Sequence, residues 1–328
     1  MKRAQYTQRG PNPAEFIEAI DVDVPAVNEG QVLIQVLAAP INPSDLLTLT
    51  GEYGALPPLP AVGGNEGVGK IVAHGPGVSA PPVGQTVLLP VGCGTWATHV
   101  VADAKKLMPL PNEADPKQLA MMTVNPPTAK LMLSEFVDLQ PGEWVIQNAA
   151  NSGVGEYLVQ IAKLRGLKTV NIVRRESAID AVKAAGGDVV LADGPGLAKR
   201  VADATGEAKI RLAIDAVGGE ATNRLAGCLT ISGTLVNYGM MSGEPCVVSP
   251  KNFVFKDVTL KGFWLAWWFR NAPFEKQMAV MGEIAKLIAT GKLHTRIHAT
   301  FDVSEIKEAV KTAAGGERGG KVLIVPRG

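Results

Sequence analysis

The stretch VIQNAANSGVGEYLVQIAKLRG, residues 145–166, joins a short apolar run, a turn of small residues and an amphipathic segment. In its last part Val154, Leu158, Ile161 and Ala162 fall on one helical stripe, and a glycine follows as a stop signal. The pattern therefore predicts a strand, a tight turn and a helix that packs against a flat surface.

The turn in this stretch has small residues at the three places of a dinucleotide fingerprint, Ala150, Ser152 and Gly155, and Gly153 lies beside them. Small residues there let the chain turn, let backbone N–H groups and the helix dipole meet a pyrophosphate, and let helix approach strand. The alternative is a purely structural turn of another α/β protein. We predict a dinucleotide site.

The rest of the chain sets this unit between two strand-rich ends. Alternating strands and helices are predicted from Pro126 onward, which indicates a mostly parallel, doubly wound sheet. Before about residue 120, short strands separated by Pro- and Gly-rich turns are typical of an antiparallel, barrel-like domain, and the tail resumes that style. We expect a nucleotide-type domain, 122–265, inserted into a domain made of 1–121 and 266–328.

Composition limits the classes of partner. The 328 residues are 46% hydrophobic and 19% charged with a net charge of +1, so no long-range field favours nucleic acid or a membrane surface. We expect neither a secretory leader nor a membrane span. The three cysteines, Cys93, Cys228 and Cys246, lack metal-ligand spacing, which favours a reducing cytoplasm and no cysteine zinc site.

The end of the second predicted strand reads NIVRRES, with Arg174 and Arg175 where an NAD enzyme normally has an acidic residue for the ribose. Arginine offers a planar fork of donors that matches a phosphate, so the pair favours NADPH over NADH. The alternative is a solvated pair of arginines beside Glu176.

A barrel-like domain split around such an insert, with Gly-Asn-Glu before a Gly-rich strand, resembles the medium-chain dehydrogenase/reductase family. The resemblance places Asn42 and Asn65 where the zinc alcohol dehydrogenases have a Cys and a His, and an asparagine is a poor zinc ligand. We therefore expect no metal. Reduction of a polarised C=C bond remains possible, and it needs an acid.

Six motifs carry a closer resemblance, to the zinc-free 2-enoyl thioester reductases, including the mitochondrial enoyl-CoA/acyl-carrier-protein branch. They are INPSD (41–45), GEYG (51–54), LPPLPAVGGNEGVG (56–69), VNPPTAKLML (124–133), NAANSGVG (148–155) and KGFW (261–264). The resemblance implies an α/β architecture: a GroES-like catalytic domain with a Rossmann domain for NADPH.

The resemblance also implies residue roles, with Tyr53 as the proton donor. The cofactor contacts that it implies are Asn125, Ser152, Gly153, Val154, Gly155, Arg174, Arg175, Tyr238, Gly239, Met240, Met241, Phe263, Trp264, Leu265 and Lys321. This chain departs from the mitochondrial branch at Arg175-Glu176, where that branch has Asp-Arg, and at Met240, where it has glycine.

Several of these residues have plainer interpretations. Asn42, Asn65 and Trp267 are candidate substrate-pocket residues, although Trp264, Trp267 and Trp268 are equally consistent with core or dimer contact. Asp45 is expected to cap the helix that begins at NPSD. Lys321 is alternatively a solvated lysine at a strand end.

The sequence thus predicts an NADPH-dependent reductase of trans-2-enoyl thioesters, of CoA or acyl carrier protein. One alternative is a zeta-crystallin-type quinone or α,β-enone reductase, and the other is a non-enzymatic NADPH-binding module. The resemblance further implies a homodimer that pairs through the strand VTLKGFW, 258–264.

Overall fold

The computed structural model describes residues 1–315 and 318–327, which form two compact units. Unit 1 comprises Met1–Val124 and Met281–Gly328, and unit 2 comprises Asn125–Val280. The second boundary therefore lies further along the chain than the predicted 265/266. The reason is that the segment after it folds with unit 2: Lys276 Nζ lies 2.9 Å from Glu135 Oε2 and 6.0 Å from the ring centroid of Trp268.

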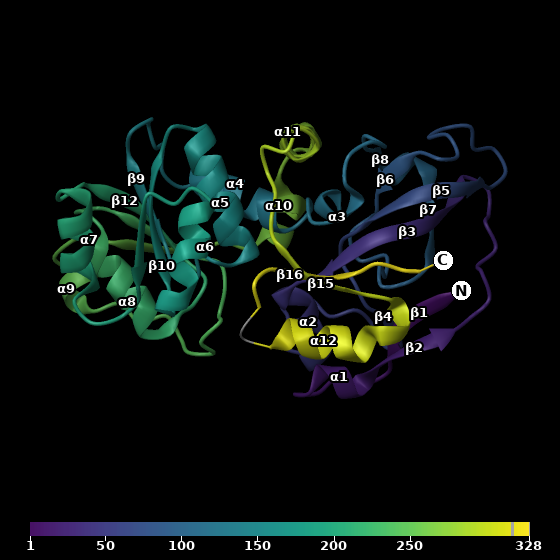
Figure 1. Ribbon diagram of the computed structural model, residues 1–328, viewed down its shortest axis with the longest axis horizontal. Helices are drawn as coiled ribbons and strands as arrows, with labels where there is room; N and C mark the ends of the chain where they lie inside the picture. The colour runs from purple at the N-terminus through teal and green to yellow at the C-terminus, as the bar shows by residue number, and fades with distance from the viewer. Residues whose placement is uncertain (316–317, 328) are drawn as a thin grey trace. The chain divides into compact units, whose positions relative to one another are not determined.

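Unit 2 is built on a six-stranded parallel sheet in the order β11-β10-β9-β12-β13-β14. Figure 1 labels three of its strands, β9, β10 and β12. The first and fourth strands of the unit, β9 and β12, are neighbours, so the strand order reverses between them. This confirms the doubly wound architecture, whose ligands bind where the order reverses. The strands are β9 (Trp144–Gln147), β10 (Lys168–Val173), β11 (Val189–Ala192), β12 (Ile210–Asp215), β13 (Thr234–Asn237) and β14 (Thr259–Gly262).

Helices cover both faces of this sheet. Helix α5 packs beside α4, whereas α7 packs beside α8 across the sheet (Figure 1). The central strands are buried on both sides, which explains their continuous apolar runs: Ile146, Val170 and Ala213 are fully buried. The helices are α4 (Asn125–Ser134), α5 (Gly153–Leu164), α6 (Ile179–Ala184), α7 (Leu197–Thr205), α8 (Gly219–Cys228), α9 (Pro250–Phe253) and α10 (Leu265–Asn271), with a 3₁₀ turn at Glu176–Ala178 and α11 (Phe274–Ala289) crossing the boundary between the units.

Unit 1 is organised around one long strand, β3, which pairs antiparallel with β5, β7 and β16. Because β16 comes from the end of the chain, the prediction that the tail returns to the first domain is confirmed. A second sheet has the order β2-β1-β4. The strands are β1 (Lys2–Tyr6), β2 (Ile17–Asp21), β3 (Gln31–Ile41), β4 (Ala61–Val62), β5 (Val68–His74), β6 (Thr86–Leu88), β7 (His99–Asp103), β8 (Met108–Pro109), β15 (Ile297–Phe301) and β16 (Lys321–Ile324).

The helices of unit 1 are short and lie at its margins. They are α1 (Pro13–Phe16), α2 (Pro43–Thr50), α3 (Pro116–Leu119) and α12 (Ile306–Ala314), with 3₁₀ turns at Ala104–Lys106 and Val303–Glu305. Strands β1 and β2 were not predicted, because many of their residues are polar. In β1 only Ala4 and Tyr6 are buried, which is too short an alternation to indicate a strand. Among the described residues, no helix combines the length and apolar character needed to cross a bilayer.

Helix α5 approaches the end of β9 so closely that its third residue has no room for a side chain. A Cβ on Gly155 would lie 2.5 Å from the carbonyl oxygen of Ala150. This is the close approach of helix and strand that the third fingerprint position serves.

Replacement of Gly155 by alanine is therefore expected to push α5 away from the turn. We expect Gly155→Ala to lower the free energy of unfolding in urea by about 2–3 kcal/mol, as overpacking does elsewhere. The matched control is Gly282→Ala in α11, where nothing lies within 4 Å of the new Cβ. Alanine has the higher helix propensity, so the control should unfold at equal or higher urea concentration. Equal losses in both variants would contradict the packing argument.

Candidate active site and cofactor-binding edge

The turn between β9 and α5 is fixed to its neighbouring strands by backbone hydrogen bonds. Asn148 donates its N–H to Ile214 O at 3.1 Å, and Ala150 donates to Ile172 O at 3.2 Å. Ser152 is the N-cap of α5, and its Oγ accepts the N–H of Gly155 at 3.2 Å. The turn thus presents the positive end of a helix dipole at the point where the strand order reverses, which is a site for a phosphate group.

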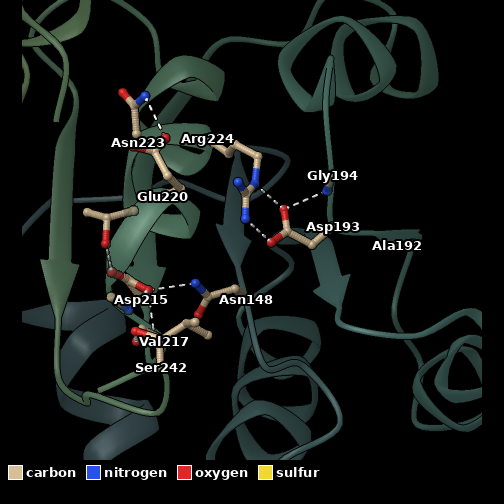
Figure 2. Close-up of polar contacts among 12 residues, drawn as sticks. Asn148, Ala192, Asp193, Gly194, Asp215, Val217, Glu220, Asn223, Arg224 and Ser242 are labelled. Carbon is tan, nitrogen blue, oxygen red and sulfur yellow. Dashed lines mark hydrogen bonds and ion pairs between the residues drawn. The ribbon is translucent and has the colours of Figure 1, made fainter. Parts of the chain in front are cut away.

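Asp215 connects the loops at this edge of the sheet, as Figure 2 shows in part. Its side chain is fully buried. Oδ1 accepts from Asn148 Nδ2 at 2.6 Å and from the N–H groups of Val217 and Gly218 at 2.9 and 3.2 Å. Oδ2 accepts from the Thr222 hydroxyl at 2.6 Å and from the side-chain amide of the last β13 residue at 3.1 Å. One carboxylate therefore holds the carboxyl ends of β9, β12 and β13 in a fixed arrangement.

The turn at residues 238–241, here called the YG turn, carries four of the predicted cofactor contacts and follows β13 on the same edge. Tyr238 donates its N–H to Asp215 O at 2.9 Å. Burial raises the pKa of Tyr238 well above its ordinary value, and a hydrogen bond with Ser152 partly opposes that shift. Gly239 lies so close to Ala216 that a Cβ would be 2.7 Å from its carbonyl oxygen. The structure thus brings Tyr238 and Gly239 to the turn that carries Ser152.

The two methionines after this turn are exposed: 53% for Met240 and 64% for Met241. Met241 donates its N–H to Ala216 O at 3.1 Å. Met240 occupies a position where the mitochondrial branch has glycine. At this edge it adds a flexible, exposed apolar side chain.

Arg174 and Arg175 directly follow β10, and both are exposed. Nearby, Asp193 donates its N–H to Val173 O at 2.8 Å, and its carboxylate is held in a two-point ion pair by Arg224, at 2.7 and 2.6 Å (Figure 2). This ion pair neutralises the acidic group beside the arginines, which favours an anionic ligand there.

The other predicted cofactor residues of unit 2 begin helices. Asn125 is the buried first residue of α4, and Trp264 is the N-cap of α10, which starts at Leu265. The ring of Phe263 packs edge-on against Phe136 with 6.0 Å between centroids. Trp267 is 61% exposed, so the core interpretation of this residue is wrong.

In unit 1, the substrate-pocket candidates Asn42 and Asn65 belong to a buried hydrogen-bond network. Asn42 donates Nδ2 to Glu66 Oε1 at 2.6 Å, and Asn65 donates Nδ2 to Asp45 Oδ1 at 2.7 Å. Lys321 donates its ammonium to Asn42 Oδ1 and to Ile41 O, the latter at 3.2 Å. The alternative of a solvated strand-end lysine is therefore wrong, since Lys321 is only 8% exposed.

Asp45 has a second function in this network. Its Oδ2 accepts the N–H of Asn42 at 2.7 Å and so closes a capping box at the start of α2, which confirms the predicted cap. Burial raises the pKa of Asp45 to about 6, against the hydrogen bonds from Asn42 and Asn65. Burial also raises the pKa of Glu66 and lowers that of Lys321, and the attraction between the two groups opposes both shifts.

Tyr53, the predicted acid, follows the C-terminal turn of α2. Its N–H donates to Leu47 O at 3.1 Å, as does the N–H of Gly51, which takes the left-handed conformation that ends the helix. The side chain is partly buried. Helix α2 thus begins in the buried network, at Asn42, and delivers Tyr53 at its other end.

Two family models match this chain. The family model described as "Alcohol dehydrogenase GroES-like domain" matches residues 28–112, and that described as "Zinc-binding dehydrogenase" matches residues 153–278. The mitochondrial enoyl-[acyl-carrier-protein] reductase of Rattus norvegicus is 37% identical over 308 residues, which are 92% of this chain and 83% of that protein. The chain therefore belongs to the enoyl thioester reductases of the medium-chain dehydrogenase/reductase family.

Two solved structures superpose over nearly the whole chain. The complex of Etr1p with NADP and crotonyl-CoA is 26% identical with a TM-score of 0.87, and the match covers 99% of each chain. A mycobacterial quinone oxidoreductase is 25% identical with a TM-score of 0.84, covering 99% of this chain and 100% of that one. The architecture is thus shared by enzymes named for thioesters and for quinones.

The residues at the family's zinc position do not fit a zinc ion. The amide nitrogens of Asn42 and Asn65 point to carboxylates, and the ammonium of Lys321 bonds to Asn42 Oδ1. Within residues 1–315 and 318–327, no group of three or more His, Cys, Asp or Glu side chains is arranged to hold a metal. Zinc ligands are thiolates, imidazoles and carboxylates. The carboxylates here, of Glu66 and Asp45, already accept hydrogen bonds from the two asparagine amides, and a lysine ammonium bonds to Asn42.

Sequence reasoning missed Asp215 and the carboxylate of Glu66. Asp215 ends an apolar strand at the edge where ligands bind, so a polar residue at that place in IRLAIDAV was the available signal. Glu66 lies in the quoted GGNEG motif, but only its buried contacts reveal a structural function.

Proposed function

We propose that this chain reduces the C=C bond of trans-2-enoyl thioesters, of CoA or acyl carrier protein, with NADPH. The observation that carries the proposal is the similarity over 92% of the chain to an enoyl-[acyl-carrier-protein] reductase. The turn before α5 supports it, because Ser152 caps the helix and the N-terminus of a helix favours a phosphate group.

The chain's own groups suit NADPH. The first turn of α5 and the YG turn would hold the pyrophosphate region, and Arg174 and Arg175 would take the 2′-phosphate. The ion pair of Asp193 with Arg224 removes a competing negative charge from that end of the site. The remaining proposed contacts, at Asn125 and Phe263 to Leu265, rest on the family resemblance, which also implies one at Lys321.

When bound, NADPH supplies the hydride for the β carbon of the enoyl group. Tyr53 is the proposed acid at the α carbon, because a phenol hydroxyl carries its proton near neutral pH and can donate it. Asn65 and Trp267 are proposed to contact the substrate. Asn42 is 1% exposed and directs its amide to Glu66 and Lys321, which weighs against a direct contact with substrate.

A quinone or α,β-enone reductase is the second candidate, because a mycobacterial quinone oxidoreductase has the same architecture over the whole chain. The thioester proposal ranks first, since the relative that is 37% identical is named for enoyl-acyl-carrier-protein reduction.

The acceptor decides between the two activities. We expect the purified chain to oxidise NADPH with crotonyl-CoA at least about tenfold faster than with a quinone, and faster than it oxidises NADH. Tyr53→Phe should lower kcat about 100-fold, as loss of a general acid does, whereas Tyr6→Phe in β1 should leave it unchanged. Turnover of quinone alone would contradict the proposed substrate, and an unchanged rate in Tyr53→Phe would contradict the proposed acid.

We also propose that two copies pair through β14. This strand ends the sheet, and all four of its residues are exposed. Leu260 of this strand is an exposed apolar residue, and further exposed apolar residues of unit 2 precede β14 in the chain; they are Ile231, Phe253, Val254 and Phe255. An open strand edge with an apolar surface is suited to sheet extension by a second copy.

Sedimentation velocity tests this pairing. We expect the chain to sediment as a dimer and Phe255→Glu to shift it to monomer, because a carboxylate would enter an apolar interface. The matched control, Val91→Glu at another exposed apolar position, should remain dimeric. A monomeric parent chain, or a dimer unaffected by Phe255→Glu, would contradict the proposal.

For the compartment, we propose a reducing one, with the cytoplasm as the expectation from the sequence. The three cysteines are unpaired, and Cys246 is exposed, which suits a thiol-reducing environment. The rat relative is named as mitochondrial, and the mitochondrial matrix would satisfy the same chemistry. Fractionation of cells of the source organism separates the two compartments.

A further inference from the structure

Lys321 lies in the interior of unit 1, where it makes hydrogen bonds within the protein. Its ammonium donates to Asn42 Oδ1 and to the carbonyl of Ile41. Lys321 is the first residue of β16, the strand that pairs with the end of β3. A buried ammonium is costly unless an opposite charge lies near. An anionic group is therefore expected near this ammonium.

Two carboxylates share this interior, and both are more deeply buried than the lysine. Glu66 is fully buried and Asp45 is 3% exposed. Asn42 connects all three charged groups, because it accepts from Lys321, donates Nδ2 to Glu66 at 2.6 Å and donates its N–H to Asp45 at 2.7 Å. Both carboxylates attract the ammonium. Lys321 is thus a cation that partly compensates the two buried carboxylates.

Glu66 passes this interaction on to the backbone that leaves unit 1. Its Oε2 accepts the N–H groups of Thr123 and Val124 at 3.0 and 2.9 Å. The backbone of Glu66 is itself fixed, since its carbonyl accepts from the Thr95 hydroxyl at 2.8 Å. Hydrogen bonds to an ionised carboxylate are about twice as strong as neutral ones, so the charge on Glu66 determines how firmly this segment is held.

The segment held by Glu66 leads directly to Asn125, the proposed contact with NADPH. Thr123 is 3% exposed, so two consecutive backbone N–H groups end on one buried carboxylate. A shift of that carboxylate would move the residues immediately before Asn125.

We propose that Lys321 is a positioning residue: it keeps Glu66 in place and favours its ionised form, and Glu66 in turn fixes Thr123–Val124 and so the residue that follows. This differs from the direct NADPH contact that the family resemblance implies for Lys321. The inference rests on the proposed function only where Asn125 is taken to contact NADPH.

A double-mutant cycle distinguishes a positioning lysine from a lysine that contacts NADPH directly. The proteins are the parent chain, Lys321→Met, Glu66→Gln, the double variant, and Lys70→Met at an exposed position of β5 as the control. The dissociation constant of NADPH is measured by fluorescence titration at pH 7, and the urea midpoint is measured on each protein without cofactor.

If Lys321 is a positioning residue, each single variant leaves one buried charge without its partner. Each should then lose at least about tenfold in NADPH affinity and unfold at lower urea concentration, because breaking a buried pair costs far more than replacing both partners. The double variant should recover toward the parent in both measurements, and Lys70→Met should match the parent.

A direct contact between Lys321 and NADPH predicts a different pattern. In that case the double variant binds NADPH as weakly as Lys321→Met, and Glu66→Gln alone binds like the parent; either result would overturn the proposal. Should Lys321→Met not fold, Glu66→Gln still decides, since it retains the lysine. A parent chain that binds no NADPH would refute the proposed function instead, and the urea midpoints would still show whether the two charges compensate each other.

Discussion

The backbone of α5 approaches the end of β9 so closely that hydrogen is the only substituent for which Gly155 has room. Several features depend on that approach. It allows Ser152 to cap the helix and directs the helix dipole to the place where the strand order of unit 2 reverses. It also brings Ser152 within hydrogen-bond reach of Tyr238, from a strand two places away in the sheet. The nucleotide site is therefore a consequence of one packing constraint between a helix and a strand.

The two units use charge in opposite ways. In unit 2 the proposed phosphate-binding arginines are exposed, and their acidic neighbour Asp193 is already paired. In unit 1 the charged groups face inward, where Lys321, Glu66 and Asp45 are joined through Asn42. The family resemblance places Asn42 and Asn65 where the zinc alcohol dehydrogenases have metal ligands. Here the side chain of Asn42 instead bonds to the Lys321 ammonium and to Glu66.

The sequence alone predicted those features of the structure that depend on residues close together in the chain. The alternation of strands and helices predicted the sheet of unit 2, and small residues in NAANSGVG predicted the turn, because both depend on neighbours in the chain. The capping role of Asp45 was predictable for the same reason. Long-range contacts were not: nothing near Lys321 in the chain indicates that it meets Asn42. A polar residue at the end of the strand in IRLAIDAV marks Asp215, but its donors, Asn148, Thr222 and Asn237, could not be identified from the sequence. The unit boundary at 280 likewise involves contacts between residues far apart in sequence, such as the ion pair of Lys276 with Glu135.

The central claim is that this fold transfers hydride from NADPH to the β carbon of an enoyl thioester. The direct measurement uses NADPH with deuterium at both C4 positions, crotonyl-CoA and the purified chain, with mass spectrometry and NMR of the product. The account predicts butyryl-CoA with one deuterium, at the β carbon, and an α proton from the solvent. Deuterium at the α carbon, or a product without deuterium, would contradict it.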